Sequence, residues 1–110
     1  MMSDASTTTE KISSELVRED VAFAAIVTEF LDGLNARLKT MQNAIGSCDF
    51  DALRVAAHQL KGSGGGYGYP ALTEQATMLE QSAIENAAEE CKKAIAELDT
   101  LCARLVVSED

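Results

Sequence analysis

The sequence predicts an all-α protein, an antiparallel four-helix bundle with a short extra helix at its N-terminus. Apolar residues make up 46% of the 110 residues and recur at steps of three and four along four long segments, which is the spacing of one buried helix face. Ala, Leu, Glu and Lys, which favour helices, are abundant, whereas proline occurs once. No segment alternates apolar and polar residues as a half-buried strand would, and the connections are short, as in an antiparallel bundle.

The N-terminal end of the chain is predicted to form a flexible leader and a short helix. Residues 1–11 are small and polar, so we expect a leader there, followed by one helical domain over 12–110. Apolar residues at helical spacing between Ile12 and Val17 predict a helix over about 12–18. This helix would cover one end of the core.

The strongest apolar stripe predicts a long helix over 20–45. Asp20 is a suitable N-cap, Gly46 is a suitable end, and residues 47–49 would form the turn that follows. Such a stripe would bury one face of the helix against the rest of the bundle. Its members are Phe23, Val27, Phe30, Leu34, Leu38, Met41 and Ile45.

The next segment predicts a helix over 50–67 that contains His58, the only histidine of the chain. Asp49 is a suitable N-cap, and Gly68 and Pro70 come where a helix would end. The apolar positions fall on one side of this helix at about 100° per residue. They are Phe50, Leu53, Ala56, Ala57, Leu60, Gly64 and Tyr67. His58 falls opposite the centre of this stripe, so we expect its side chain to point into solvent.

The last two helices are predicted over 70–84 and 87–106. Pro70 fits the first turn of a helix, and apolar residues recur at three- and four-residue steps through both segments. Between them only Asn86 suggests a cap. A continuous helix would be too long to pack in a domain of this size, so we place a turn near 84–87.

Charge and composition argue against several classes of partner. The formal net charge is −9, which disfavours nucleic acid and anionic membrane surfaces. The sequence has neither an apolar run of about 18 residues nor a basic N-terminal segment followed by an apolar one, so we expect no membrane span and no signal peptide. The cysteines, Cys48, Cys91 and Cys102, are odd in number and lack metal-ligand spacing. Reduced thiols in the cytoplasm are the simplest account of them. We further expect a monomer with no bound metal and no bound cofactor.

His58 is the leading candidate for chemistry. A lone histidine is usually structural or incidental, but this one is predicted to face outward with Lys61 one helical turn away. Gly62 and Gly65 lie beside it along the helix, four and seven residues later, although glycine within a helix costs roughly 1 kcal/mol relative to alanine. Their missing side chains would leave the imidazole clear for another protein's surface. Neutral imidazole is nucleophilic near neutral pH, so His58 is a candidate nucleophile.

The neighbouring polar residues also have ordinary interpretations. On position alone, Lys61 is more simply a solvated lysine, and Glu80 a surface glutamate at the edge of its helix. Arg54 and Gln59 would either contact a partner or remain solvated surface. The glycine run 64–66 does not match a nucleotide-binding loop, because no strand precedes it and no Gly-Lys-Ser/Thr follows.

A longer pattern adds to these observations. From His58 to Gly64 the chain reads histidine, any residue, an aliphatic residue, lysine, glycine and then small residues, with Gly68, Leu72 and Leu79-Glu80 following. This pattern resembles the histidine-containing phosphotransfer (HPt) domains of bacterial phosphorelays, and the similarity extends over about residues 20–105. The glycine run is richer in glycine than is usual in that family.

The resemblance implies roles for three side chains. His58 would take up the phosphoryl group, and Lys61 would offset the charge of the phosphoryl oxygens. Glu80, 22 residues after the histidine, would accept a hydrogen bond from Nδ1–H, which fixes the tautomer and frees Nε2 for attack. The residues expected at the docking surface are Arg54, Gln59, Gly62 and Gly65.

The resemblance also implies the partners. These are response-regulator receiver domains and a hybrid histidine kinase, with Mg²⁺ held by the receiver and no kinase activity in this chain. The phosphoryl group would come from a receiver aspartyl phosphate and pass to a second receiver. The alternative is an acidic helical adaptor or inhibitor that binds a receiver or another signalling protein without being phosphorylated. A cleared nucleophile beside a lysine favours the carrier, because an adaptor has no use for it.

Overall fold

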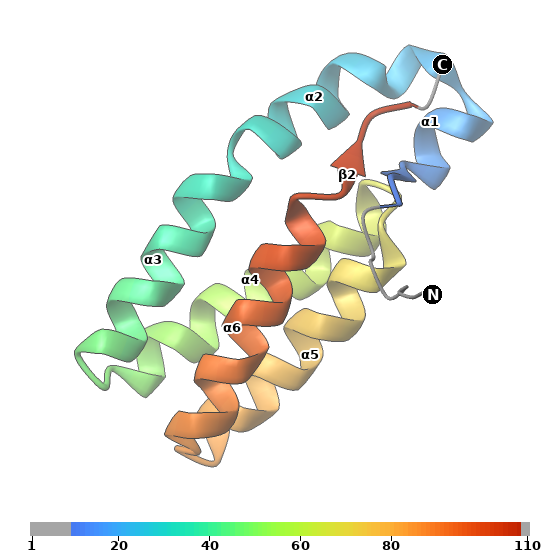
Figure 1. Ribbon diagram of the computed structural model, residues 1–110. Coiled ribbons are helices and arrows are strands. Elements are labelled where there is room, and N and C mark those ends of the chain that lie inside the picture. The colour runs from blue at the N-terminus through green and yellow to red at the C-terminus, as the bar shows by residue number, and fades with distance from the viewer. Residues whose placement is uncertain (1–9, 109–110) are drawn as a thin grey trace, which may run out of the picture.

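The computed structural model describes residues 10–108, and this part of the chain is mostly helical (Figure 1). The all-α class predicted from the sequence is confirmed. The predicted leader falls largely on residues 1–9, which lie outside the described residues. The helices are α1 (Glu15–Glu19), the 3₁₀ helix η2 (Val21–Phe23), α2 (Ala24–Asp32), α3 (Leu34–Gly46), α4 (Phe50–Gly66), α5 (Pro70–Ile84) and α6 (Ala88–Cys102).

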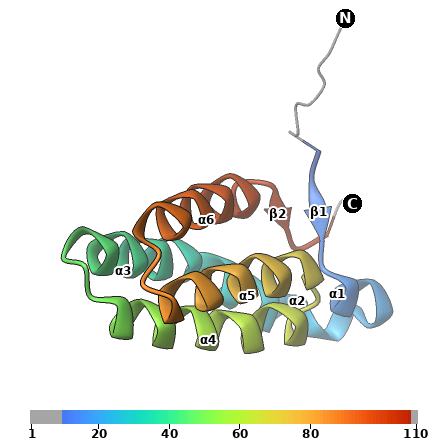
Figure 2. The same ribbon diagram turned by 90° about the horizontal axis from the view of Figure 1, so that it is seen from below.

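The core lies between the four longest helices. α3 contacts α4, α4 contacts α5, α5 contacts α6, and α6 contacts α3, with the most extensive contact between α4 and α5; Figure 2 shows α4, α5 and α6 stacked in this order. Burying a leucine side chain stabilises a fold by about 1.5–3 kcal/mol before cavity effects. Five leucines are at most 1% exposed: Leu53, Leu60, Leu72, Leu79 and Leu98.

The predicted helix over 12–18 is wrong at its start. Ile12–Ser13 form a short strand, β1, that pairs in parallel with β2 (Leu105–Val106). Helix α1 begins only after Ser14, whose hydroxyl oxygen accepts from the Val17 N–H as an N-cap. No segment of the sequence alternates as a strand would, and the described residues nevertheless include these two strands, which at two residues each are too short to show an alternating pattern.

The predicted helix over 20–45 is divided in the structure. Its first residues form η2, and Phe23 is 38% exposed there although the stripe included it. Gly33 separates α2 from α3, with its N–H shared between the carbonyls of Glu29 and Phe30. Because Gly33 keeps helical angles, φ −87° and ψ −7°, α2 and α3 follow one another along one bent arm (Figure 1). The apolar spacing therefore continues across the break, and periodicity alone could not reveal it.

The last predicted helix ends early. α6 stops at Cys102 rather than near 106, and the chain then turns, with the Arg104 N–H bonded to the Leu101 carbonyl. Leu105 is nevertheless 8% exposed, because β2 keeps it against the core. The apolar pattern was therefore correct about burial and wrong about conformation.

The turns between helices agree with their predicted places. α5 ends at Ile84 and α6 begins at Ala88, one residue later than predicted. α3, α4 and α5 each end with two hydrogen bonds back to the last turn, the arrangement of a Schellman motif. At the end of α4 the Gly68 N–H donates to Gly65 and the Tyr69 N–H to Gly64, at 3.0 and 2.8 Å. Gly68 has φ +93°, and a Cβ there would lie 2.4 Å from Ser14 Oγ, so this end of α4 requires glycine.

Candidate functional site

His58 lies on the outer face of α4, as the sequence predicted. Its side chain is 64% exposed, whereas Leu53, Ala57 and Leu60 on the opposite face are 0–1% exposed. The N-cap that starts α4 is also the predicted one, because the Asp49 carboxylate accepts from the Ala52 N–H at 3.0 Å. The helix thus buries one stripe and holds the imidazole in solvent.

Glu80 of α5 lies beside the imidazole. Its Oε2 is 2.8 Å from His58 Nδ1, and its side chain is only 14% exposed. A carboxylate can only accept hydrogen bonds, so this contact assigns the ring proton of the neutral imidazole to Nδ1. The lone pair of Nε2 is then available for attack.

The same carboxylate also binds Lys61. Nζ of Lys61 lies 2.6 Å from Glu80 Oε1, and the lysine side chain is 33% exposed. The hydrogen bond from Lys61, followed by that from His58, holds the pKa of the Glu80 carboxyl below its usual range. Glu80 therefore stays ionised and continues to act as an acceptor. The sequence had placed Lys61 near the histidine but did not reveal that it would share an acceptor with it.

The two glycines proposed to clear the site differ from each other. A Cβ built on Gly62 would meet nothing within 4 Å, so the surface beside His58 is open there. A Cβ on Gly65 would lie 3.2 Å from Thr73 Oγ1, so Gly65 also lies against α5. Gly65 is therefore exposed and at the same time in contact with α5.

Arg54 and Gln59 are also on the exposed side of α4. The Arg54 guanidinium is paired with Asp51, at 2.9 Å along the same helix, and Gln59 is exposed. The structure therefore gathers His58, Lys61 and Glu80 into one cluster and leaves these two outside its hydrogen bonds.

Sequence reasoning missed Thr73. Its hydroxyl donates to the Lys61 carbonyl at 2.8 Å and accepts from the Gly65 N–H at 2.8 Å. The available signal was its position seven residues, or about two turns, before Glu80, which puts both on the same side of α5. Nothing in that spacing shows what the hydroxyl contacts.

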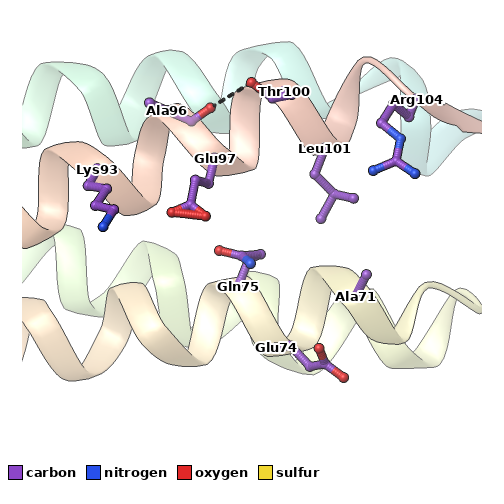
Figure 3. A pocket seen from close by; sticks show the side chains of 9 residues that line it. All are labelled: Ala71, Glu74, Gln75, Lys93, Ala96, Glu97, Thr100, Leu101 and Arg104. Carbon is purple, nitrogen blue, oxygen red and sulfur yellow. Dashed lines mark hydrogen bonds between the residues drawn. The ribbon is translucent and has the colours of Figure 1, made fainter. Parts of the chain in front are cut away.

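Within residues 10–108, no three His, Cys, Asp or Glu side chains are grouped so as to hold a metal ion. An open pocket of about 610 Å³ lies between α5 and α6 (Figure 3), and it contains none of the predicted site residues. Charged side chains of both signs line it: Glu74, Lys93, Glu97 and Arg104. Within the same range, no helix has both the length and the apolar character needed to cross a membrane.

The fold and site define a small helical protein that presents one oriented imidazole on its surface. The family model of the Hpt domain matches residues 25–107, and the chain therefore belongs to the Hpt domain family. Hpt domains carry phosphoryl groups in two-component signalling and interact with response-regulator receivers, and they are not enzymes in themselves. A search of curated proteins and a search of solved structures return no match.

Proposed function

We propose that this protein carries a phosphoryl group on His58 between two receiver domains. It accepts the group from the aspartyl phosphate of a receiver, including one attached to a hybrid histidine kinase, and donates it to another receiver. The observation that supports this most directly is the contact of 2.8 Å between His58 Nδ1 and Glu80 Oε2 on an exposed ring. That contact prepares one ring nitrogen, Nε2, to act as a nucleophile.

In the accepting step, the Nε2 lone pair attacks phosphorus and forms the N–P bond. The bond from phosphorus to the aspartyl oxygen breaks, and its electron pair leaves with the receiver's carboxylate. Nδ1 keeps its proton, so the phosphorylated ring is cationic as it forms, and the ionised Glu80 carboxylate offsets that charge. Donation to the second receiver reverses these bond changes.

Lys61 supplies positive charge to the same step. Its ammonium is held at Glu80 Oε1, 2.6 Å away, one helical turn from His58 and partly exposed. Arriving phosphoryl oxygens would compete with the carboxylate for its three N–H donors. Lysine is suited to this exchange because its charge sits at the end of a flexible chain.

The partner supplies the remaining chemistry. We expect Mg²⁺ to be held by the receiver, with no metal, cofactor or kinase activity in this chain. The receiver would dock on the exposed side of α4, where Gly62 leaves open space. We further propose that α3 to α6 form an antiparallel four-helix bundle, that residues 12–110 are one domain, and that the protein is a cytoplasmic monomer. The proposed docking residues are Arg54, Gln59, Gly62 and Gly65.

Incubation with a phosphorylated receiver tests this function. The wild-type protein should gain an acid-labile, alkali-stable label, and His58→Gln should gain none. His58 is exposed, and surface substitutions typically change the free energy of unfolding by no more than about 0.5 kcal/mol. The melting temperature of the variant should therefore stay close to that of the wild type. Label on the variant would refute the assignment of His58, and binding of the receiver without transfer to the wild type would instead support an adaptor.

A further inference from the structure

The hydroxyl of Thr73 on α5 forms hydrogen bonds with the backbone of α4. Thr73 Oγ1 donates to the Lys61 carbonyl and accepts from the Gly65 N–H, both at 2.8 Å. Lys61 and Gly65 are four residues apart, so their carbonyl and N–H are the two groups that pair in a regular α-helix. The hydroxyl bridges these groups and ties α5 to the turn of α4 that follows His58.

This contact depends on the close approach of the two helices at Gly64. A Cβ on Gly64 would lie 2.7 Å from Leu72 Cβ, 3.0 Å from Thr73 N and 3.1 Å from Thr73 Oγ1. Two of these are atoms of the backbone or next to it and cannot rotate away. Gly64 is buried, so its missing side chain serves the packing of α5 and not the clearance of the surface.

The Thr73 contact and the Glu80 contact both require the same axial position of α5 along α4. Thr73 bonds to Gly65 of α4, and Glu80, seven residues further along α5, bonds to His58, seven residues back along α4. Both steps are about two helical turns, or about 10.5 Å. A slip of α5 by four residues would bring Ala76 or Ile84 opposite the imidazole, and neither side chain can accept a hydrogen bond.

We propose that Thr73 is a positioning residue, whose hydroxyl fixes the axial register of α5 on α4 so that the Glu80 carboxylate lies at His58 Nδ1. Its role in phosphoryl transfer rests on the proposed function, whereas its effect on the ring can be measured without any partner. Lys61 connects the two contacts, because its carbonyl bonds to Thr73 and its ammonium to Glu80. Loss of the Thr73 contact should therefore disturb the positions of both Lys61 and Glu80.

The first experiment measures the tautomer of His58 in the unphosphorylated protein. Long-range ¹H–¹⁵N spectra of the ring would be recorded about two pH units above its measured titration midpoint, where the ring is neutral. Wild type and Thr73→Ser, which keeps the hydroxyl, should show the proton on Nδ1. Thr73→Val keeps the shape without the hydroxyl and should show exchange between both tautomers. Thr100→Val is the matched control, because the Thr100 hydroxyl is exposed and its hydrogen bond, to the Ala96 carbonyl, stays within α6.

The second experiment measures transfer from a phosphorylated receiver. Thr73→Val should slow it by on the order of tenfold, since small displacements of a reacting group cost this much or more, and Thr73→Ser should restore it to within about twofold. A lowered melting temperature with the wild-type tautomer and rate would show a purely structural role and overturn the proposal. If Thr73→Val does not fold, Thr73→Ala decides by the same two measurements. Absence of transfer in the wild type would refute the proposed function, and the tautomer would still decide the role of Thr73.

Discussion

Gly62 and Gly64 lie two residues apart in α4, and the same substitution to alanine should have opposite effects at the two positions. Glycine within a helix is worse than alanine by about 0.5–1 kcal/mol. At Gly62 the new methyl group meets nothing within 4 Å, so the full gain should appear in the free energy of unfolding. For a domain of this size that gain corresponds to a rise in melting temperature of about 2–4 °C.

At Gly64 the same gain is outweighed by overlap with α5. The added Cβ would be 2.7 Å from Leu72 Cβ and 3.0 Å from Thr73 N, so the two helices must separate. Overpacking of this kind costs about 2–3 kcal/mol. The net loss of about 1–2.5 kcal/mol should lower the melting temperature by about 4–10 °C.

The assay combines thermal unfolding with phosphoryl transfer. Gly62→Gln should also be at least as stable as the wild type, because glutamine favours helices and the site is open. Its side chain would nevertheless obstruct the receiver, so we expect transfer to slow by on the order of tenfold, equivalent to about 1.4 kcal/mol of lost docking energy. Equal changes in melting temperature at the two glycines would refute the packing argument. Unimpaired transfer by Gly62→Gln would refute the docking surface.

Two further predictions separate the roles of Lys61 and Glu80. Lys61→Ala should slow transfer by about 10–100-fold through lost charge stabilisation while leaving the ring proton on Nδ1. It should also raise the pKa of the Glu80 carboxyl toward its ordinary value, since the hydrogen bond from Lys61 is the largest cause of its lowering; a carboxyl ¹³C titration that does not move would contradict this. Glu80→Ala should release the His58 tautomer and slow transfer, whereas Glu80→Gln keeps an amide oxygen that can accept from Nδ1–H and should retain the tautomer. Identical ring spectra for wild type and Glu80→Ala would show that Glu80 does not orient the ring.

Helix positions and burial were predictable because they follow local periodicity. The stripe of α4, its N-cap at Asp49 and the outward direction of His58 all depend on residues within one segment. Gly33 was not predictable as a break, because it interrupts the helix without leaving helical angles. The pairing of Ile12 with Leu105 joins residues 93 positions apart, and strands of two residues have no pattern of their own.

The site was predictable only in part. The contact between His58 and Glu80 was anticipated from the family resemblance and not from geometry. The hydrogen bond from Lys61 to Glu80 and the bridge made by Thr73 depend on how α5 is placed along α4. That placement is set by the close approach at Gly64, a tertiary contact that no spacing within one helix specifies.

The pairing of β1 with β2 also determines how this fold can be rearranged. Ile12 lies opposite Leu105, and the Glu10 carbonyl accepts from Arg104 Nε at 2.8 Å, so the described chain enters and leaves the domain at neighbouring points (Figure 2). In topological terms the backbone is nearly a closed ring. A circular permutant can therefore join these points with a short linker and open the chain at Cys48, in the exposed α3–α4 turn. Such a cut would leave the covalent segment from α4 through α5 intact, and with it the connection between His58 and Glu80.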